Sequence, residues 1–285
     1  MHRSDSISGG REPALEKNWR LTLAYDGAAF HGWQIQPDAV ETPTVQAALA
    51  AAILQVTGEQ VLPQGAGRTD AGVHALGQVA SFCLRAPIPA ENLLRALNRV
   101  LPPAILVQGV APAPLGFHAR HSATGKIYRY CVVRSAKCPP HLSRYAVAVR
   151  WPLNVAAMQA AAAAVIGRHD FTSFAASDPD KSERGGNASR SMVREIHESQ
   201  WEETQTAGGL LAGPQELLTY TVRGSGFLHH MVRNLVGTFL EVGRGTLRPE
   251  AIGEILAARD RRSAGPTAPP NGLYLVKVLY PQMPE

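Results

Sequence analysis

The sequence predicts an α+β fold made of two ferredoxin-like halves, each a split βαβ unit with an antiparallel sheet. Strand-like and helix-like segments follow the order β-α-β-β-α-β in the first half. A similar order recurs in the second half, without a repeat at the level of residues. The composition, 45% hydrophobic and 18% charged over 285 residues, supplies enough apolar side chains for a large core.

The first half opens on a strand, because apolar and polar residues alternate up to an Asp-Gly turn at 26–27. Thr44 is a suitable N-cap for a helix whose apolar residues recur at helical spacing, and the pair Pro102-Pro103 ends a second helix. The predicted elements are a strand at 19–27, a helix at 44–56, strands near 59–63 and 77–85, a helix at 89–102 and a strand at 104–113.

The second half is predicted in the same way, with a first helix that Gly167 closes. Its elements are a strand at 126–134, a helix at 154–167, strands at 193–202 and 217–226, helices at 226–243 and 249–259, and a strand at 273–280. We expect loops at 178–189 and 204–214. The domain boundaries that follow are a disordered tail at 1–17, an N-terminal domain at 18–113 and a C-terminal domain at 114–285.

The charge balance favours a polyanionic partner. The formal net charge is +5, and of the 28 basic residues only five are lysines. Arginine suits bidentate phosphate contacts and stacking on flat rings, so RNA is one explanation. An arginine-rich genome is the other.

The cysteines and the apolar segments exclude several classes of protein. Cys83, Cys131 and Cys138 are far apart and lack CxxC spacing, which argues against a disulfide framework and a zinc site. Reduced thiols in a cytosolic protein fit better. The sequence shows no signal peptide, and its longest apolar runs fall short of the roughly 18 residues that a membrane span needs.

Asp70 lies in the glycine-rich stretch GAGRTDAGVHA (65–75), between two apolar segments. An aspartate in such a place is ordinarily a turn residue that bonds its own backbone. Arg68, two residues earlier, shares a face with it on an extended chain and would favour the ionised carboxylate. That form is needed for nucleophilic attack on a sugar carbon, and small neighbours leave room for a bulky ligand. Asp70 is therefore a candidate nucleophile.

Arg233 shares an apolar face of the helix predicted at 226–243 with Val236 and Leu240. An unpaired buried charge is very costly, so this arginine needs a partner. We expect the partner to be Asp70. The alternatives are a side chain that extends to the surface, or an ion pair with Glu241.

His229 and His230 are adjacent, so on a helix their side chains would point about 100° apart. They would then not face one metal ion, and the sequence has no HExxH motif. We expect no bound metal, and assign the two histidines to packing or to phosphate contacts.

Aromatic and basic side chains gather around the strand that opens the second half. Alternation puts Tyr128 and Tyr130 on one face of that strand and Arg129 on the other. The tyrosines either belong to an ordinary core or stack on a base drawn out of its helix. His118 and Arg120, just upstream, form a candidate RNA-contact patch.

Taken together, these segments resemble the tRNA pseudouridine synthase A family. The matching segments are AYDGAAFHGWQ (24–34), PTVQ (43–46), GRTDAGVHALGQVASF (67–82), FHAR (117–120), KIYRY (126–130), DFTSF (170–174), FLHHMVRNLVG (227–237) and GLYLVKV (272–278). The order GRTDAGVHA then HHMVRN is very specific, whereas a lone Arg-Thr-Asp is not. The loop at 176–189 looks long for the family.

The resemblance implies a cofactor-free isomerase that converts uridines 38, 39 and 40 of the tRNA anticodon arm to pseudouridine. Asp70 would be the nucleophile, by attack on C1′ or through a glycal, and Arg233 would hold it ionised and in place. Tyr128 would stack on the flipped uracil and take part in proton transfer, and Arg68 would hold the place of the nucleotide or contact its phosphate. The resemblance also implies a central cleft between two halves, a cytoplasmic homodimer, and a tRNA that crosses both subunits.

Two other functions are compatible with some of these features. A non-catalytic RNA-binding protein with ferredoxin-like sheets would usually carry the RNP1 pattern, which the sequence lacks. A phosphate-handling enzyme with a glycine-rich loop would need the P-loop lysine, which is also missing, as is a dinucleotide-binding GxGxxG. Asp70 separates the hypotheses, because a pure binder would keep its binding in Asp70→Asn.

Overall fold

The computed structural model describes residues 15–35, 43–176, 191–205 and 216–281. Most of the predicted tail at 1–17 and of the predicted loops at 178–189 and 204–214 therefore lies outside the described residues.

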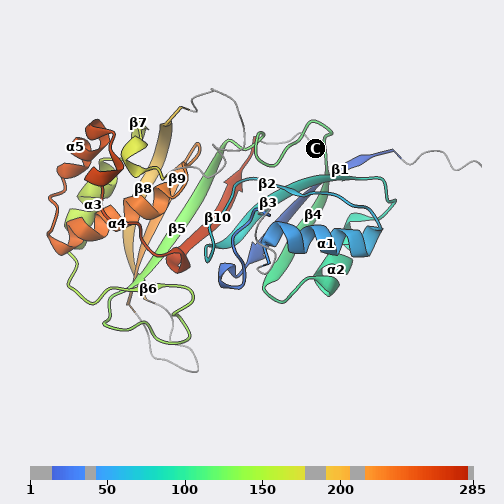
Figure 1. The fold of residues 1–285 in the computed structure, drawn as a ribbon, viewed down its shortest axis with the longest axis horizontal. Coiled ribbons are helices and arrows are strands. Elements are labelled where there is room, and N and C mark those ends of the chain that lie inside the picture. Colours follow the sequence, from blue (N-terminus) through green and yellow to red (C-terminus); the bar gives the residue numbers. More distant parts are fainter. Residues whose placement is uncertain (1–14, 36–42, 177–190, 206–215, 282–285) are drawn as a thin grey trace, which may run out of the picture.

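Within these residues, ten strands form one sheet in the order β4-β1-β3-β10-β5-β9-β8-β7, with β2 paired to β3 and β6 to β5 (Figure 1). The strands are β1 (Lys17–Tyr25), β2 (Gln64–Gly65), β3 (His74–Leu84), β4 (Ile105–Ala113), β5 (Gly125–Val133), β6 (Val147–Ala148), β7 (Gly167–Asp170), β8 (Val193–Gln205), β9 (Glu216–Gly224) and β10 (Leu273–Leu279). Neighbouring strands are antiparallel except for β3 with β10 and β5 with β6.

The helices fall into two groups along this sheet. They are α1 (Val45–Thr57), α2 (Ala90–Val100), α3 (Val155–Ala163), α4 (Met231–Arg244) and α5 (Ala251–Ala258). In Figure 1, α1 and α2 lie with β1 to β4, and α3, α4 and α5 lie with β7 to β9. Strands β5 and β10 cross the middle, so residues of both halves meet there.

Local sequence explains the best-defined elements. Thr44 caps α1 by accepting a hydrogen bond from the backbone N–H of Ala47, and Gly58 ends the helix in a left-handed conformation at φ +75°. Val45, Leu49 and Ile53 face the core from one side of α1. Helix α4 is buried on almost every side, because both the sheet and the segment before β10 cover it.

Two expectations about single elements are wrong. Residues 59–63 are not a strand: Pro63 has no N–H to donate to a ladder, and its carbonyl accepts from the side chain of Gln46 at 2.9 Å. The short strand β2 follows directly after this segment, at Gln64–Gly65. The helix predicted to run to Gly167 ends at Ala163 in tighter turns, and Gly167, at φ +107°, opens β7 instead.

The helix predicted at 226–243 begins only at Met231. His230 has φ +57°, a left-handed conformation that an α-helix does not continue through. His229 and His230 therefore lie in the turn before α4, and the expected separation of about 100° between their side chains does not apply.

The sheet also differs from the predicted pair of antiparallel sheets. Tyr274 and Leu275 of β10 pair in parallel with His74 and Ala75 of β3, which joins the two sets of strands. One hydrophobic cluster runs through both. Within the described residues, no helix combines the length and the hydrophobicity that crossing a membrane requires.

Candidate active site

Asp70 occupies the tight turn between β2 and β3. Its carbonyl accepts a hydrogen bond from the N–H of Val73 at 3.1 Å, and Gly72 takes φ +79°, the conformation that glycine favours at the third position of such a turn. The side chain of Asp70 is 22% exposed. The turn thus holds a partly buried carboxylate on a fixed backbone.

The segment before Asp70 is anchored from several sides. The hydroxyls of Tyr25 and Thr69 are hydrogen-bonded at 2.8 Å, and the carbonyl of Thr69 accepts from the N–H of Trp33 at 3.0 Å. The Gln78 amide donates to the carbonyl of Gly67 at 2.8 Å. Burial raises the pKa of Tyr25 to about 12, so this anchor stays neutral.

Arg233, in the first turn of α4, is the strongest partner of Asp70. Its Nη1 donates to Asp70 Oδ2 at 2.7 Å, and its Nε donates to the carbonyl of Ala268 at 2.8 Å. The arginine is only 13% exposed. The ion pair predicted from the sequence is confirmed, and the alternative pairing with Glu241 is wrong. A charge-assisted hydrogen bond of this kind fixes the orientation of the carboxylate.

His229 and His230 lie against the same carboxylate. Nε2 of His229 is 3.6 Å from Asp70 Oδ1, and Nε2 of His230 is 3.3 Å from Asp70 Oδ2. The two imidazole rings have their centroids 3.9 Å apart. Removal from water lowers the pKa of His230; the charge of Asp70 opposes this, while His229, Arg233 and Arg261 add to it.

Asp70, His229 and His230 are residue types that bind metal ions. One possible ligand atom of each lies within 4.8 Å of the others. However, Asp70 Oδ2 already accepts from the guanidinium of Arg233. That fixed cation repels a second one and supplies the positive charge that a metal would bring. We therefore do not assign the three residues as metal ligands.

Tyr128 approaches the site from β5. It is buried, and its ring meets that of Phe227 edge-on with centroids 5.0 Å apart. Leu275 of β10 pairs with Tyr128 on one side and Ala75 on the other, so a single strand separates Tyr128 from the start of β3. Burial, with the charge of Asp70 as a further cause, raises the pKa of Tyr128 well above its ordinary value, so the hydroxyl stays protonated.

Basic side chains border the other side of the Asp70 loop. A hollow of about 80 Å³ has a lining that includes Trp33, Gln64, Gly67, Arg68 and Arg120. It lies beside Asp70 rather than over it, because Asp70 is not part of its lining. Arg68 and Arg120 therefore line the hollow beside the Asp70 loop.

Lys126 adds a charge near the same hollow. A Cβ placed on Gly67 would lie 3.3 Å from the Lys126 Nζ, so the ammonium covers the backbone of the Asp70 loop. Burial lowers the pKa of Lys126 to about 8, and the charges of Arg120 and Arg194 contribute. Neighbouring cations lower one another's pKa, and a bound anion stabilises their charged forms. A phosphate group is an anion that could bind there.

His118 is used locally. Its Nδ1 accepts from the backbone N–H groups of Arg120 and His121, at 3.1 and 3.4 Å. It is not part of the lining of the hollow. Of the residues 117–120, Arg120 is the one that the structure brings to the basic side of the Asp70 loop.

The family model described as tRNA pseudouridine synthase matches residues 22–122 and 161–281. The chain belongs to the tRNA pseudouridine synthase family. The resemblance inferred from the sequence is confirmed, and with it the expectation of an isomerase. Asp70 and Arg233 both fall inside the matched segments, whereas Tyr128 falls between them.

Curated relatives in this family cover nearly the whole chain. A tRNA pseudouridine synthase A of Moorella thermoacetica is 47% identical over 92% of this chain and 98% of its own. Proteins of the same name from Solibacter usitatus and Brevibacillus brevis are 45% and 42% identical, over 92% and 93% of this chain and 98% and 100% of their own.

Two features of this family member were not expected from its sequence. The contact of His229 and His230 with Asp70 was missed, because it depends on the left-handed backbone of His230. Lys126 was not singled out either, although it is one of only five lysines and opens the motif KIYRY, which are the signals that would have found it.

Proposed function

We propose that this protein isomerises uridine to pseudouridine in tRNA, at positions 38, 39 and 40 of the anticodon arm, with Asp70 as the nucleophile. One observation carries the proposal: Arg233 donates at 2.7 Å to Oδ2 of Asp70, a partly buried carboxylate on a fixed turn. The names of the relatives support the substrate, and the anticodon positions come from the resemblance of motifs.

In this proposal, the chemistry needs one ionised carboxylate. Asp70 attacks C1′ of the ribose, or removes a proton that leads to a glycal, and the uracil is released, turned and rejoined through C5. Arg233 supplies the opposite charge and orients the carboxylate through its hydrogen bond. Tyr128 provides a buried aromatic ring that stacks on the flipped uracil, which must first leave its place in the RNA at a cost of a few kcal/mol.

Phosphate contacts offset the cost of extracting the base. Arg68 and Arg120 border the hollow beside Asp70, and Lys126 adds a third cation. These residues would hold the backbone next to the extruded nucleotide, with His118 supporting the backbone of Arg120.

We further propose two ferredoxin-like domains, at 18–113 and 114–285, with a cleft between them. The strand orders β4-β1-β3-β2 and β10-β5-β9-β8 support this. If the four strands of each set are numbered along the chain, leaving out β6 and β7, both sets have the order fourth, first, third, second. A homodimer whose two subunits share one tRNA, acting in the cytoplasm, completes the proposal.

Substitution of Asp70 tests the function. Asp70→Asn keeps the size of the side chain and removes the carboxylate, so we expect no pseudouridine in an anticodon-arm transcript, with binding of the transcript retained. Chemical mapping of pseudouridine and a binding titration measure the two effects. Turnover by Asp70→Asn would remove Asp70 from the role of nucleophile, and a wild-type protein that binds RNA without modifying it would favour the pure RNA binder.

A further inference from the structure

The pair His229-His230 contacts Asp70, and the proposed function gives it no task. We propose that His230 is the base that takes the proton from C5 of the uracil in the last chemical step. This inference rests on the proposed function, because it concerns the same reaction at the same carboxylate.

The reaction requires such a base by either route. Once C5 has bonded to C1′, the uracil ring is no longer aromatic and C5 still carries its hydrogen. The C5–H bond must break, its electron pair must form the C5–C6 double bond, and the electron pair of the C6–N1 double bond must move to N1. N1 then takes a proton from water, and the protein group that accepted the C5 proton returns it to water, so the overall change is an isomerisation.

Distance limits where this base can lie. At this stage C5 is bonded to C1′, and Asp70 reacts at C1′ of the ribose or at the carbon beside it. The base must therefore lie within a few ångströms of the Asp70 carboxylate. Nε2 of His230 is 3.3 Å from Asp70 Oδ2, and Nε2 of His229 is 3.6 Å from Asp70 Oδ1.

Two of the other groups near the carboxylate, Tyr128 and Arg233, are poorer bases. Tyr128 keeps its proton, because burial raises its pKa, and the guanidinium of Arg233 has only N–H donors and no acceptor. Asp70 itself accepts a charge-assisted hydrogen bond from Arg233, and a carboxylate is ordinarily a weaker base than an imidazole. Asp70 and His229, whose Nε2 is 3.6 Å from Asp70 Oδ1, are therefore the competitors that an experiment must separate from His230.

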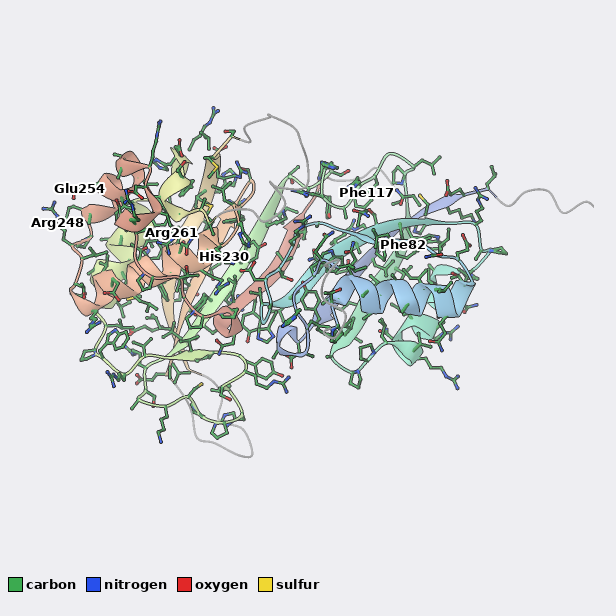
Figure 2. The ribbon with its side chains drawn as sticks, in the orientation of Figure 1. Phe82, Phe117, His230, Arg248, Glu254 and Arg261 are labelled. Atoms are coloured by element: carbon green, nitrogen blue, oxygen red, sulfur yellow. The ribbon has the colours of Figure 1, made fainter. Side chains whose placement is uncertain are left out.

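The charges around His230 keep it neutral, as a base must be. Asp70, His229, Arg233 and Arg261 are the groups that act on it, and with desolvation their combined effect is a lowered pKa. Figure 2 shows His230 near the middle of the molecule, with Arg261 to its left on the side of α4. Nε2 faces the carboxylate oxygen, so the neutral ring carries its hydrogen there, and Nδ1 is the nitrogen that accepts the proton from C5 at neutral pH.

The backbone fixes the position of the ring. His230 and Arg259 are the two residues other than glycine that have a positive φ in the described part of the chain. Such a conformation persists only where the surrounding structure holds it, and it often marks a functional site. Here the carbonyl of His230 accepts the first bond of α4, from Asn234 at 2.9 Å, and the carbonyl of His229 accepts from Ala176 at 3.0 Å.

His230→Asn is the sharpest test, because asparagine tolerates the left-handed conformation and caps helices well but is not a base. The substrate is an anticodon-arm transcript with protium or deuterium at C5 of uridine, converted in a single turnover. We expect His230→Asn to bind the transcript normally, to react about 100-fold more slowly or worse, and to show a primary deuterium isotope effect larger than that of the wild type. Added imidazole should restore part of the rate.

The exposed His197 provides the control, since His197→Asn on β8 should change neither the rate nor the isotope effect. A rate for His230→Asn close to that of the wild type, or a slow rate with no increase in the isotope effect, overturns the inference and leaves Asp70 or His229 as the base. A wild type that forms no pseudouridine refutes the proposed function instead.

The wild-type protein gives a second measurement that does not depend on the folding of a variant. Protonated His230 cannot accept a proton, so the rate should fall as the pH drops through its lowered pKa, and the isotope effect should grow at the same time. An isotope effect that stays constant while the rate falls counts against His230.

Discussion

At the scale of single residues, the site is an acid held by one arginine and faced by two histidines. Arg233 donates both to Asp70 and to the carbonyl of Ala268, so the same guanidinium holds the carboxylate and the segment before β10. A planar fork does this better than an ammonium group, which offers no fixed angle between its donors.

Arg233→Ala should slow pseudouridine formation by about 100-fold or more, because removing one partner of a largely buried ion pair costs about 3 kcal/mol and the barrier rises by a similar amount. Arg233→Lys should fall between this variant and the wild type, because it keeps the charge and loses the fork. Single-turnover rates at saturating RNA measure the effect on the chemical step.

The exposed ion pair between Arg248 and Glu254 supplies a matched control, far from His230 in Figure 2. Arg248→Ala should leave the rate unchanged and alter stability by no more than about 0.5 kcal/mol. If Arg233→Ala is folded and as fast as Arg248→Ala, the role given to Arg233 is wrong.

At the scale of elements, the sequence predicted what local patterns and single charges decide. Thr44 and the apolar stripe behind it predicted α1, and the need of Arg233 for an acid predicted its contact with Asp70. The start of α4 could not be predicted in this way. FLHHMVRN has nothing that forbids a helix, and the left-handed turn at His230 depends on contacts with residues elsewhere in the chain.

The close fit between α4 and the segment 265–268 positions the site. A Cβ on Gly237 would overlap the backbone carbonyl oxygen of Pro266. Because Ala268 of that segment accepts from Arg233, any shift there moves the guanidinium. This glycine is needed for close approach of two backbones rather than for a positive φ.

Gly237→Ala should therefore reduce stability by about 1–3 kcal/mol and reduce the rate further than the loss of folded protein explains. Chemical denaturation and the single-turnover rate of the folded fraction separate the two effects. Gly253→Ala on α5 is the matched control, because nothing lies within 4 Å of its Cβ position. It should be neutral or stabilise the protein by up to about 1 kcal/mol. Equal behaviour of the two variants would contradict the account.

At the scale of the whole molecule, one parallel pairing joins the two sets of strands. It involves only His74 and Ala75 of β3 with Tyr274 and Leu275 of β10. The ring of His74 stacks on that of Tyr274 with centroids 4.9 Å apart, and His74 Nε2 is 2.8 Å from the carbonyl oxygen of Arg144. No local pattern predicts a pairing so short between segments so distant in sequence, which is why separate sheets were expected.

This junction sets the geometry of the site, because Asp70 precedes β3, whereas Tyr128 lies on β5 and Arg233 on α4, in the half of the molecule beyond β10. Gly77 of β3 lies against it: an added Cβ would be 2.5 Å from the backbone carbonyl oxygen of Val276 on β10. Gly77→Ala must push β10 away from β3, and with it the partners of Asp70.

We expect Gly77→Ala to lose about 1–3 kcal/mol of stability and to slow the chemical step, while binding of the anticodon-arm transcript changes little. Thermal unfolding, a binding titration and single-turnover rates measure the three quantities. Gly109→Ala on β4 is the control, because it is also a glycine in a strand and its Cβ would meet nothing within 4 Å. If the folded Gly77→Ala protein reacts as fast as Gly109→Ala, the junction between β3 and β10 does not control the distance between Asp70 and the groups that act with it.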